Sequence, residues 1–217
     1  NHLAVKQLAE IAKQQNSFFI HISTDYVFDG TNHKPYVETD KVNPINTYGL
    51  TKLKGEQAIE ASGCAGTIIR TSWVYSEFGN NFVKTMIRLG EERDNLNVIY
   101  DQVGSPTYAT DLAYAIITIL NSEFSSINAS ANSDTQSSIN IYHYSNEGVC
   151  SWYDFAKAIF EMRNIECKVN PVETKDYPVS AKRPYYSVMN KTKVKKISGI
   201  AVPYWKQSLA DLVGCKV

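Results

Sequence analysis

The chain has 217 residues, of which 43% are hydrophobic and 20% are charged, a composition ordinary for a globular protein. Lys plus Arg and Asp plus Glu number 22 each, so the sequence lacks the positive excess of nucleic-acid-binding or membrane-surface proteins. No apolar run approaches the ~20 residues of a membrane span. These features predict a protein with no nucleic-acid partner and no membrane partner.

Strands and helices alternate along most of the chain. The continuous apolar character of residues 18–23 suits a parallel strand that is covered on both faces. We expect further strands at 67–71, 97–100 and 141–144, and helices at 2–14, 48–61, 81–92, 109–120 and from Ser151 onward. Residues 125–140, rich in Ser and Asn, are expected to form a surface connection. This order predicts an α/β fold with an incomplete Rossmann-type, doubly wound parallel sheet.

The last third of the chain interrupts this alternation with several prolines and short segments. We therefore expect a small C-terminal α/β substrate-binding lobe beside the sheet. In the predicted division, residues 1–72 and 93–147 form the C-terminal part of a nucleotide-binding Rossmann domain. Residues 73–92 and 148–217 form the substrate-binding lobe.

Cysteine and histidine spacing excludes other kinds of site. The four cysteines are scattered without C-x-x-C spacing, which indicates reduced structural thiols and a cytoplasmic protein. No pair of histidines has the spacing of metal ligands, so we expect no metal. The serines lack a G-x-S-x-G context, which leaves serine hydrolase chemistry unsupported.

Two Y-x-x-x-K pairs, Tyr48 with Lys52 and Tyr153 with Lys157, could each place a phenol and an ammonium on one helix face. A nearby ammonium favours the phenolate and brings the phenol's pKa down from ~10 towards the neutral range. Such a phenol could protonate a carbonyl oxygen as a general acid. About one pair of this kind is expected by chance, so the spacing alone does not decide.

The surroundings of the two pairs differ. Ser23-Thr24-Asp25-Tyr26 follows the buried strand before Tyr48, at the strand end where open α/β sheets place their ligands. A hydroxyl there could hydrogen-bond a substrate carbonyl while Tyr48 donates its proton. Tyr153 and Lys157 have no comparable strand ahead of them. The Tyr48 pair is therefore the candidate.

Several further blocks follow in order: Ser23–Gly30, Pro44–Glu56, Arg70–Tyr75, Gly79–Met86, Asp101–Thr107 and Arg183-Pro184 with Ser187. Together they resemble the extended short-chain dehydrogenase/reductase family. The chain is similar to the branch that reduces the 4-keto group of a dTDP-6-deoxy-hexulose and makes dTDP-rhamnose for cell-surface polysaccharides. The similarity runs through most of the chain and is weakest in 121–140 and in the last stretch.

The resemblance implies a role for each matching residue. Tyr48 would protonate the sugar C4 oxygen as hydride arrives from NADPH or NADH. Lys52 would lower the pKa of Tyr48 and hydrogen-bond the nicotinamide ribose, so both residues would also bind the cofactor. Thr24 would be the third catalytic residue. The substrate-binding residues, which would hold a nucleotide sugar, would be Thr24, Asp25, Trp73, Asn81 and Arg183. A homodimer is a further expectation.

The sequence departs from that family in one respect, because none of its eleven glycines forms G-x-G-x-x-G or G-x-x-G-x-x-G. We expect a cofactor-binding segment of roughly 60–80 residues upstream, given ~30 residues per βαβ unit. The alternative is a naturally short protein that cannot hold the cofactor in the conventional way. The 217-residue piece alone is then expected to bind NADPH poorly and to have little activity. The alternatives are a non-catalytic regulatory subunit of the same fold and a related epimerase. A dehydratase is disfavoured because Asp25 precedes Tyr26 where an Asp-Glu pair is expected.

Overall fold

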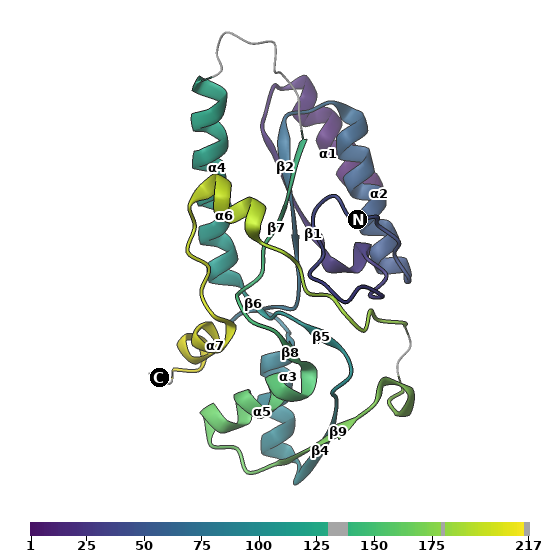
Figure 1. The fold of residues 1–217 in the computed structure, drawn as a ribbon, viewed down its shortest axis with the longest axis vertical. Helices are drawn as coiled ribbons and strands as arrows, with labels where there is room; N and C mark the ends of the chain where they lie inside the picture. The colour runs from purple at the N-terminus through teal and green to yellow at the C-terminus, as the bar shows by residue number, and fades with distance from the viewer. Residues whose placement is uncertain (130–138, 179–180, 215–217) are drawn as a thin grey trace.

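A computed structural model describes residues 1–129, 139–178 and 181–214 (Figure 1). The largest sheet has three parallel strands in the order β1-β2-β7. These strands are β1 (Phe19–Thr24), β2 (Gly66–Thr71) and β7 (Ile139–His143). All three end towards the middle of the molecule, where the second part of the chain begins.

Helices cover both faces of this sheet. One face carries α1 (Leu3–Gln14) and α2 (Thr47–Ser62), and the other carries α4 (Ala109–Ala129) and α6 (Thr192–Ser198). Successive strand residues point to opposite faces, so Ile68 packs in the α1–α2 cluster and Ile69 in the α4–α6 cluster. The predicted parallel sheet with two covered faces is confirmed.

The second part lies below the sheet in Figure 1 and contains a separate apolar core. Its parallel pair is β4 (Asn95–Ile99) with β9 (Lys168–Val172). Around this pair lie the helices α3 (Phe82–Glu92), α5 (Trp152–Arg163) and α7 (Trp205–Val213). The start of α5 is fixed by a capping box between Ser151 and Asp154, as the sequence predicts.

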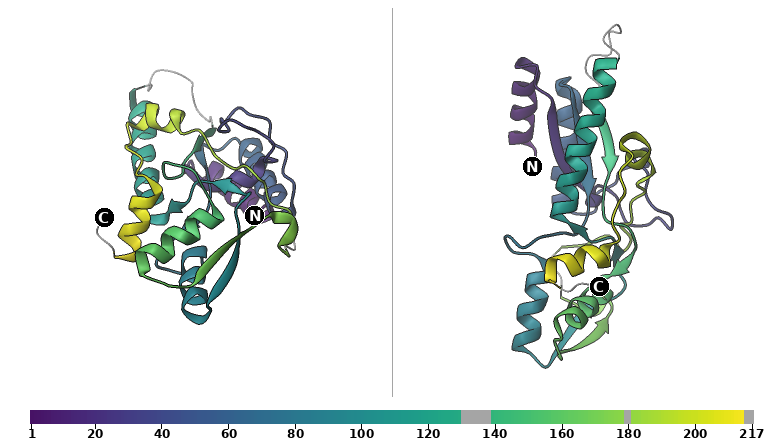
Figure 2. Two further views of the ribbon diagram at one scale, coloured as in Figure 1. Left: turned by 60° about the horizontal axis from the view of Figure 1, so that its bottom comes forward. Right: turned by 90° about the vertical axis from the view of Figure 1, so that its left-hand side faces the viewer.

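Short pairings join the two parts. β3 (Val74–Tyr75) pairs with β6 (Thr107–Tyr108), and β5 (Val103–Gly104) pairs with β8 (Cys150–Ser151). Two short 3-10 helices, η1 (Asp25–Val27) and η2 (Thr174–Asp176), complete the described elements. The C-terminal stretch crosses back over the first part, where bridges join Tyr36 to Met189 and Val103 to Tyr186. Figure 2 shows the elongated outline that results.

The structure differs from the predicted elements in three places. The helix expected at 109–120 continues to Ala129, so part of the expected connection at 125–140 is helical, and residues 130–138 lie outside the described residues. β4, expected in the first part, pairs with β9 in the second. α6, expected in the lobe, packs on the sheet. We propose the same two-part division, with β4 assigned to the second part and α6 assigned to the first. None of the described helices is long and apolar enough to cross a bilayer.

Candidate active site

The C-terminal end of β1 presents two buried polar side chains. Thr24 ends the strand and caps η1, its hydroxyl oxygen accepting a hydrogen bond from the Tyr26 backbone N–H at 3.2 Å. The same hydroxyl donates to Oδ1 of Asp25 at 3.0 Å. Asp25 is only 2% exposed, and this burial raises the pKa of its carboxyl to about 7, although hydrogen bonds from Thr24 and Ser187 oppose the shift.

α2 carries Tyr48 and Lys52 against this strand end. Asn46 begins the helix, its side-chain oxygen accepting from the Gly49 N–H at 2.8 Å. A Cβ on Gly49 would lie 2.1 Å from the carbonyl oxygen of Tyr26, so only glycine allows α2 to approach η1 this closely. The close approach brings the phenol of Tyr48 within hydrogen-bonding reach of Thr24.

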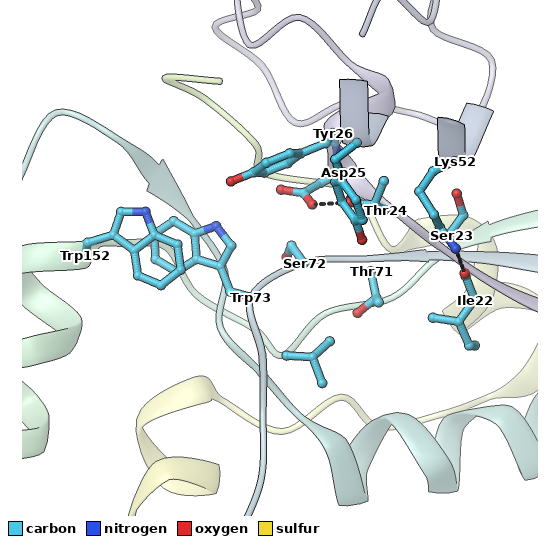
Figure 3. Close-up of a pocket in the computed structure, with 12 residues that line it drawn as sticks. Ile22, Ser23, Thr24, Asp25, Tyr26, Lys52, Thr71, Ser72, Trp73 and Trp152 are labelled. Carbon is cyan, nitrogen blue, oxygen red and sulfur yellow. Dashed lines mark hydrogen bonds between the residues drawn. The ribbon is translucent and has the colours of Figure 1, made fainter. Parts of the chain in front are cut away.

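Lys52 is buried, and its ammonium faces the backbone of β1. Nζ donates to the carbonyl oxygen of Ile22 at 2.5 Å (Figure 3). It also lies 3.2 Å from Nε2 of His21. Burial lowers the pKa of Lys52, and the charge of Glu56 partly offsets this. Burial also raises the pKa of Tyr48, which the hydrogen bond from Thr24 opposes and the charge of Asp25 supports.

The expected lowering of the Tyr48 pKa by Lys52 is therefore wrong for this structure. Tyr48 is held above the ordinary phenol pKa by burial, while the Lys52 ammonium is directed to Ile22 and His21. A raised pKa keeps the phenol protonated at neutral pH. This state suits a group that donates a proton to a carbonyl oxygen.

One pocket of about 430 Å³ collects most of the predicted site residues. Thr24, Asp25, Tyr48, Lys52 and Trp73 all line it. At the end of the pocket away from Lys52, the indole of Trp73 stacks on that of Trp152, as Figure 3 shows. The Tyr153 and Lys157 pair does not line this pocket and lies on α5 in the second part.

The remaining two predicted substrate residues lie elsewhere. Arg183 lines an adjoining pocket, which shares Tyr26 and Tyr48 with the first. Asn81 lines neither pocket and instead caps α3. Its side-chain oxygen accepts a hydrogen bond from the Lys84 N–H, and its amide nitrogen donates to the Ser76 carbonyl oxygen at 2.7 Å. An Asn immediately before a predicted helix is itself the signal of a cap.

The RmlD substrate binding domain family matches residues 1–215. This chain belongs to that family. The dTDP-4-dehydrorhamnose reductase of Sinorhizobium fredii is 42% identical over 217 residues, which is 98% of this chain and 71% of the relative. The Escherichia coli enzyme of the same name is 38% identical, covering 95% of this chain and 68% of its own length.

Solved structures of RmlD-type proteins share the fold. The dTDP-4-dehydrorhamnose reductase of Clostridium acetobutylicum has a TM-score of 0.88 and 39% identity, covering 99% of this chain and 71% of that one. The Bacillus anthracis protein of that name, in complex with NADP, has a TM-score of 0.83 and 37% identity, covering 98% and 70%. The predicted doubly wound α/β fold is confirmed by these comparisons.

The pocket of this RmlD family chain fits one end of a nicotinamide cofactor. The phenol of Tyr48, the hydroxyl of Thr24 and the ammonium of Lys52 line one cavity, and an ammonium with two N–H groups engaged keeps a third to donate. Such donors suit the hydroxyls of a ribose. The glycine fingerprint that holds a dinucleotide pyrophosphate does not occur in the 217 residues.

Among the residues that sequence reasoning missed are Trp152, which lines the pocket, and His21, which contacts Lys52. Trp152 lines the pocket from the first turn of α5, far along the chain from Trp73. His21 reaches Lys52 from the middle of β1. Alternation along the strand could have placed His21 on the α2 face, but nothing in the sequence alone pairs it with Lys52.

Proposed function

We propose that this chain carries the proton-donating and substrate-binding part of an NAD(P)H-dependent dTDP-4-dehydrorhamnose reductase. The enzyme would reduce the 4-keto group of a dTDP-6-deoxy-hexulose and make dTDP-L-rhamnose for cell-surface polysaccharide. One observation carries the proposal: Tyr48, Lys52 and Thr24 line a single pocket in a chain that is similar, over nearly its whole length, to reductases of that name.

The chemistry divides between the cofactor and the chain. A bound NADPH or NADH supplies the hydride. The phenol of Tyr48, which is protonated at neutral pH, donates a proton to the C4 oxygen of the sugar. The hydroxyl of Thr24 lies beside that phenol and would turn its proton from Oδ1 of Asp25 to the same sugar oxygen. Lys52 would hold the ribose through the N–H that Ile22 and His21 leave free.

The substrate-binding side chains surround the reacting group. Asp25 and Trp73 line the same pocket as Tyr48 and would contact the sugar. Arg183 in the adjoining pocket would bind the diphosphate through its planar fork of N–H donors. We leave Asn81 out of this set because its amide is engaged in the cap of α3.

The test is NADPH oxidation by the complete reading frame that encodes this chain, with the 4-keto sugar nucleotide as substrate. Tyr48→Phe should lower kcat by about 10²–10⁴-fold, the usual contribution of a positioned acid–base group. Tyr153→Phe is the matched control from the second Y-x-x-x-K pair and should retain activity. Lack of turnover by a folded, cofactor-loaded wild-type protein would favour the regulatory-subunit alternative.

We further propose a cytoplasmic location, which the free state of the buried Cys64, Cys150 and Cys167 supports. A homodimer is proposed as well. Light scattering of the complete protein tests the dimer. The balanced charge of the chain supports the absence of a nucleic-acid partner.

A further inference from the structure

The ammonium of Lys52 has three N–H donors, and β1 engages two of them. One donates to the carbonyl oxygen of Ile22 at 2.5 Å, and Nε2 of His21 lies 3.2 Å from the same nitrogen. Both acceptors come from consecutive residues of one strand. Lys52 is only 8% exposed, so bulk water cannot readily replace either acceptor.

The contact with His21 requires that its Nε2 carries a lone pair, since an ammonium can only donate. Burial, together with the neighbouring charge of Lys52, lowers the pKa of His21 to about 4. The imidazole is therefore neutral at physiological pH and can accept the hydrogen bond at Nε2. Glu56 is the further charged group that acts on Lys52, and it favours the ammonium form.

We propose that His21 is a positioning residue for the reduction, fixing the Lys52 ammonium so that its third N–H faces the pocket. With Ile22 and His21 as two fixed acceptors, the ammonium cannot rotate freely about its last bond, and the remaining donor is held for the ribose. This inference rests on the proposed function. A small misplacement of a catalytic group can cost ~10²-fold in rate, so an acceptor of this kind has a measurable effect.

The competing interpretation is that His21 only packs against its neighbours. Its ring lies parallel to that of Phe19, with centroids 6.5 Å apart and planes at 12°. Loss of this packing would lower stability and activity whether or not Lys52 is present. A positioning role predicts that the effect on activity depends on Lys52, so a double-mutant cycle separates the two.

The cycle uses His21→Leu, His21→Gln and Lys52→Met in the complete protein, with kcat/KM measured for NADPH-dependent reduction. His21→Leu should lower kcat/KM by about 10–50-fold, within the range that misplacement of a catalytic group causes. His21→Gln, whose amide oxygen can accept in place of Nε2, should stay within about 3-fold of wild type. In the Lys52→Met background, His21→Leu should cost less than about 2-fold.

His33→Leu is the control, because His33 lies exposed in the loop after β1. It should leave kcat/KM unchanged. An equal loss from His21→Leu in both backgrounds would overturn the proposal, as would a Gln variant as impaired as the Leu variant.

A second readout does not depend on turnover. The ring resonances of His21, followed by NMR over pH, should titrate at higher pH in Lys52→Met, because removal of the neighbouring charge favours the imidazolium. An unchanged titration would overturn the contact itself. If Lys52→Met shows the shift but the wild-type protein does not reduce the sugar nucleotide, the proposed function is overturned, and with it the role of His21 in that reaction.

Discussion

Trp73 and Trp152 stack face to face, with ring centroids 3.5 Å apart and an angle of 11° between their planes. The backbone of Trp73 has φ of 48°, in the left-handed region that costs a residue with a side chain about 1–3 kcal/mol. Gly104 lies against Trp73 as well, since a Cβ there would be 2.8 Å from Cε2 of the indole. The stack and Gly104 together hold Trp73 in its strained conformation at the pocket.

Gly104→Ala should displace the Trp73 indole and raise the KM for the sugar nucleotide roughly 10-fold, because a displaced contact loses binding geometry. Gly199→Ala is a control for stability, since Gly199 has φ of 65° and no neighbouring atom within 4 Å of an added Cβ. It should lower the free energy of unfolding by about 1 kcal/mol and leave KM unchanged. Steady-state kinetics on both variants checks this, and equal KM values would contradict the role of Gly104.

Thr24→Val should lower kcat about 10²-fold, because the buried site loses the hydroxyl that would hydrogen-bond the developing negative charge on the substrate oxygen. Thr24→Ser keeps the hydroxyl and should retain most of the activity. Single-turnover reduction of the 4-keto sugar measures the chemical step directly. A Val variant as fast as the Ser variant would exclude Thr24 from catalysis.

Asp25→Asn should change how stability depends on pH. The folded-state pKa of about 7 lies above the ordinary value of 3.8, so the folded protein binds a proton that the unfolded chain releases between these values. Wild-type stability from this group therefore falls as pH rises from about 4 to 7, by up to about 4 kcal/mol. The free energy of unfolding of Asp25→Asn, relative to that of wild type, should therefore increase from about pH 4 to 7 and stay constant above pH 7.

Urea unfolding at several pH values measures this difference. Asp29 is the matched control: hydrogen bonds from the Thr31 backbone and side chain help to lower its pKa to about 2. The ionised Asp29 carboxylate therefore contributes to the stability of the folded protein above pH 3.8, and this contribution is lost only as pH falls towards 2. The difference between Asp29→Asn and wild type should accordingly stay constant from pH 5 to 8. A pH-independent difference for Asp25→Asn would contradict the buried, protonated carboxyl.

Glu56→Gln should lower the free energy of unfolding by about 3–5 kcal/mol, because it leaves the buried Arg70 guanidinium uncompensated. The two side chains form an ion pair at 2.7 Å and are 2% and 4% exposed. The exposed pair of Arg88 and Glu92, at 2.9 Å, is the control, and Glu92→Gln should cost less than about 1 kcal/mol. Similar losses in the two variants would show that burial of the first pair has no energetic consequence.

Local patterns in the sequence were sufficient for the sheet and for the centre of the site. Three short-range features were involved. They are the apolar strand 18–23, the Ser-Thr-Asp segment at its C-terminal end, and the i,i+4 spacing of Tyr48 and Lys52 on the following helix. They determine where a strand ends and which helix face meets it. The pocket that collects Thr24, Tyr48 and Lys52 follows from these features alone.

The remaining features depend on contacts that no local pattern encodes. β4 pairs in parallel with β9, which lies some seventy positions later in the chain. Pairing at that separation produces no periodic pattern in the sequence. Trp152 reaches Trp73 from another helix. The direction of the Lys52 ammonium was mispredicted because the i,i+4 rule places side chains on one face but does not say which acceptor takes the charge.

The C-terminal stretch runs back over the first part, where Met189 bridges to Tyr36 and α6 packs on the sheet, before α7 returns to the second core. Neither half of the molecule is thus one uninterrupted length of polypeptide. A single pair of crossover points therefore cannot exchange the second part as a unit, because the exchanged segment would also carry elements of the first, such as α4, β7 and α6.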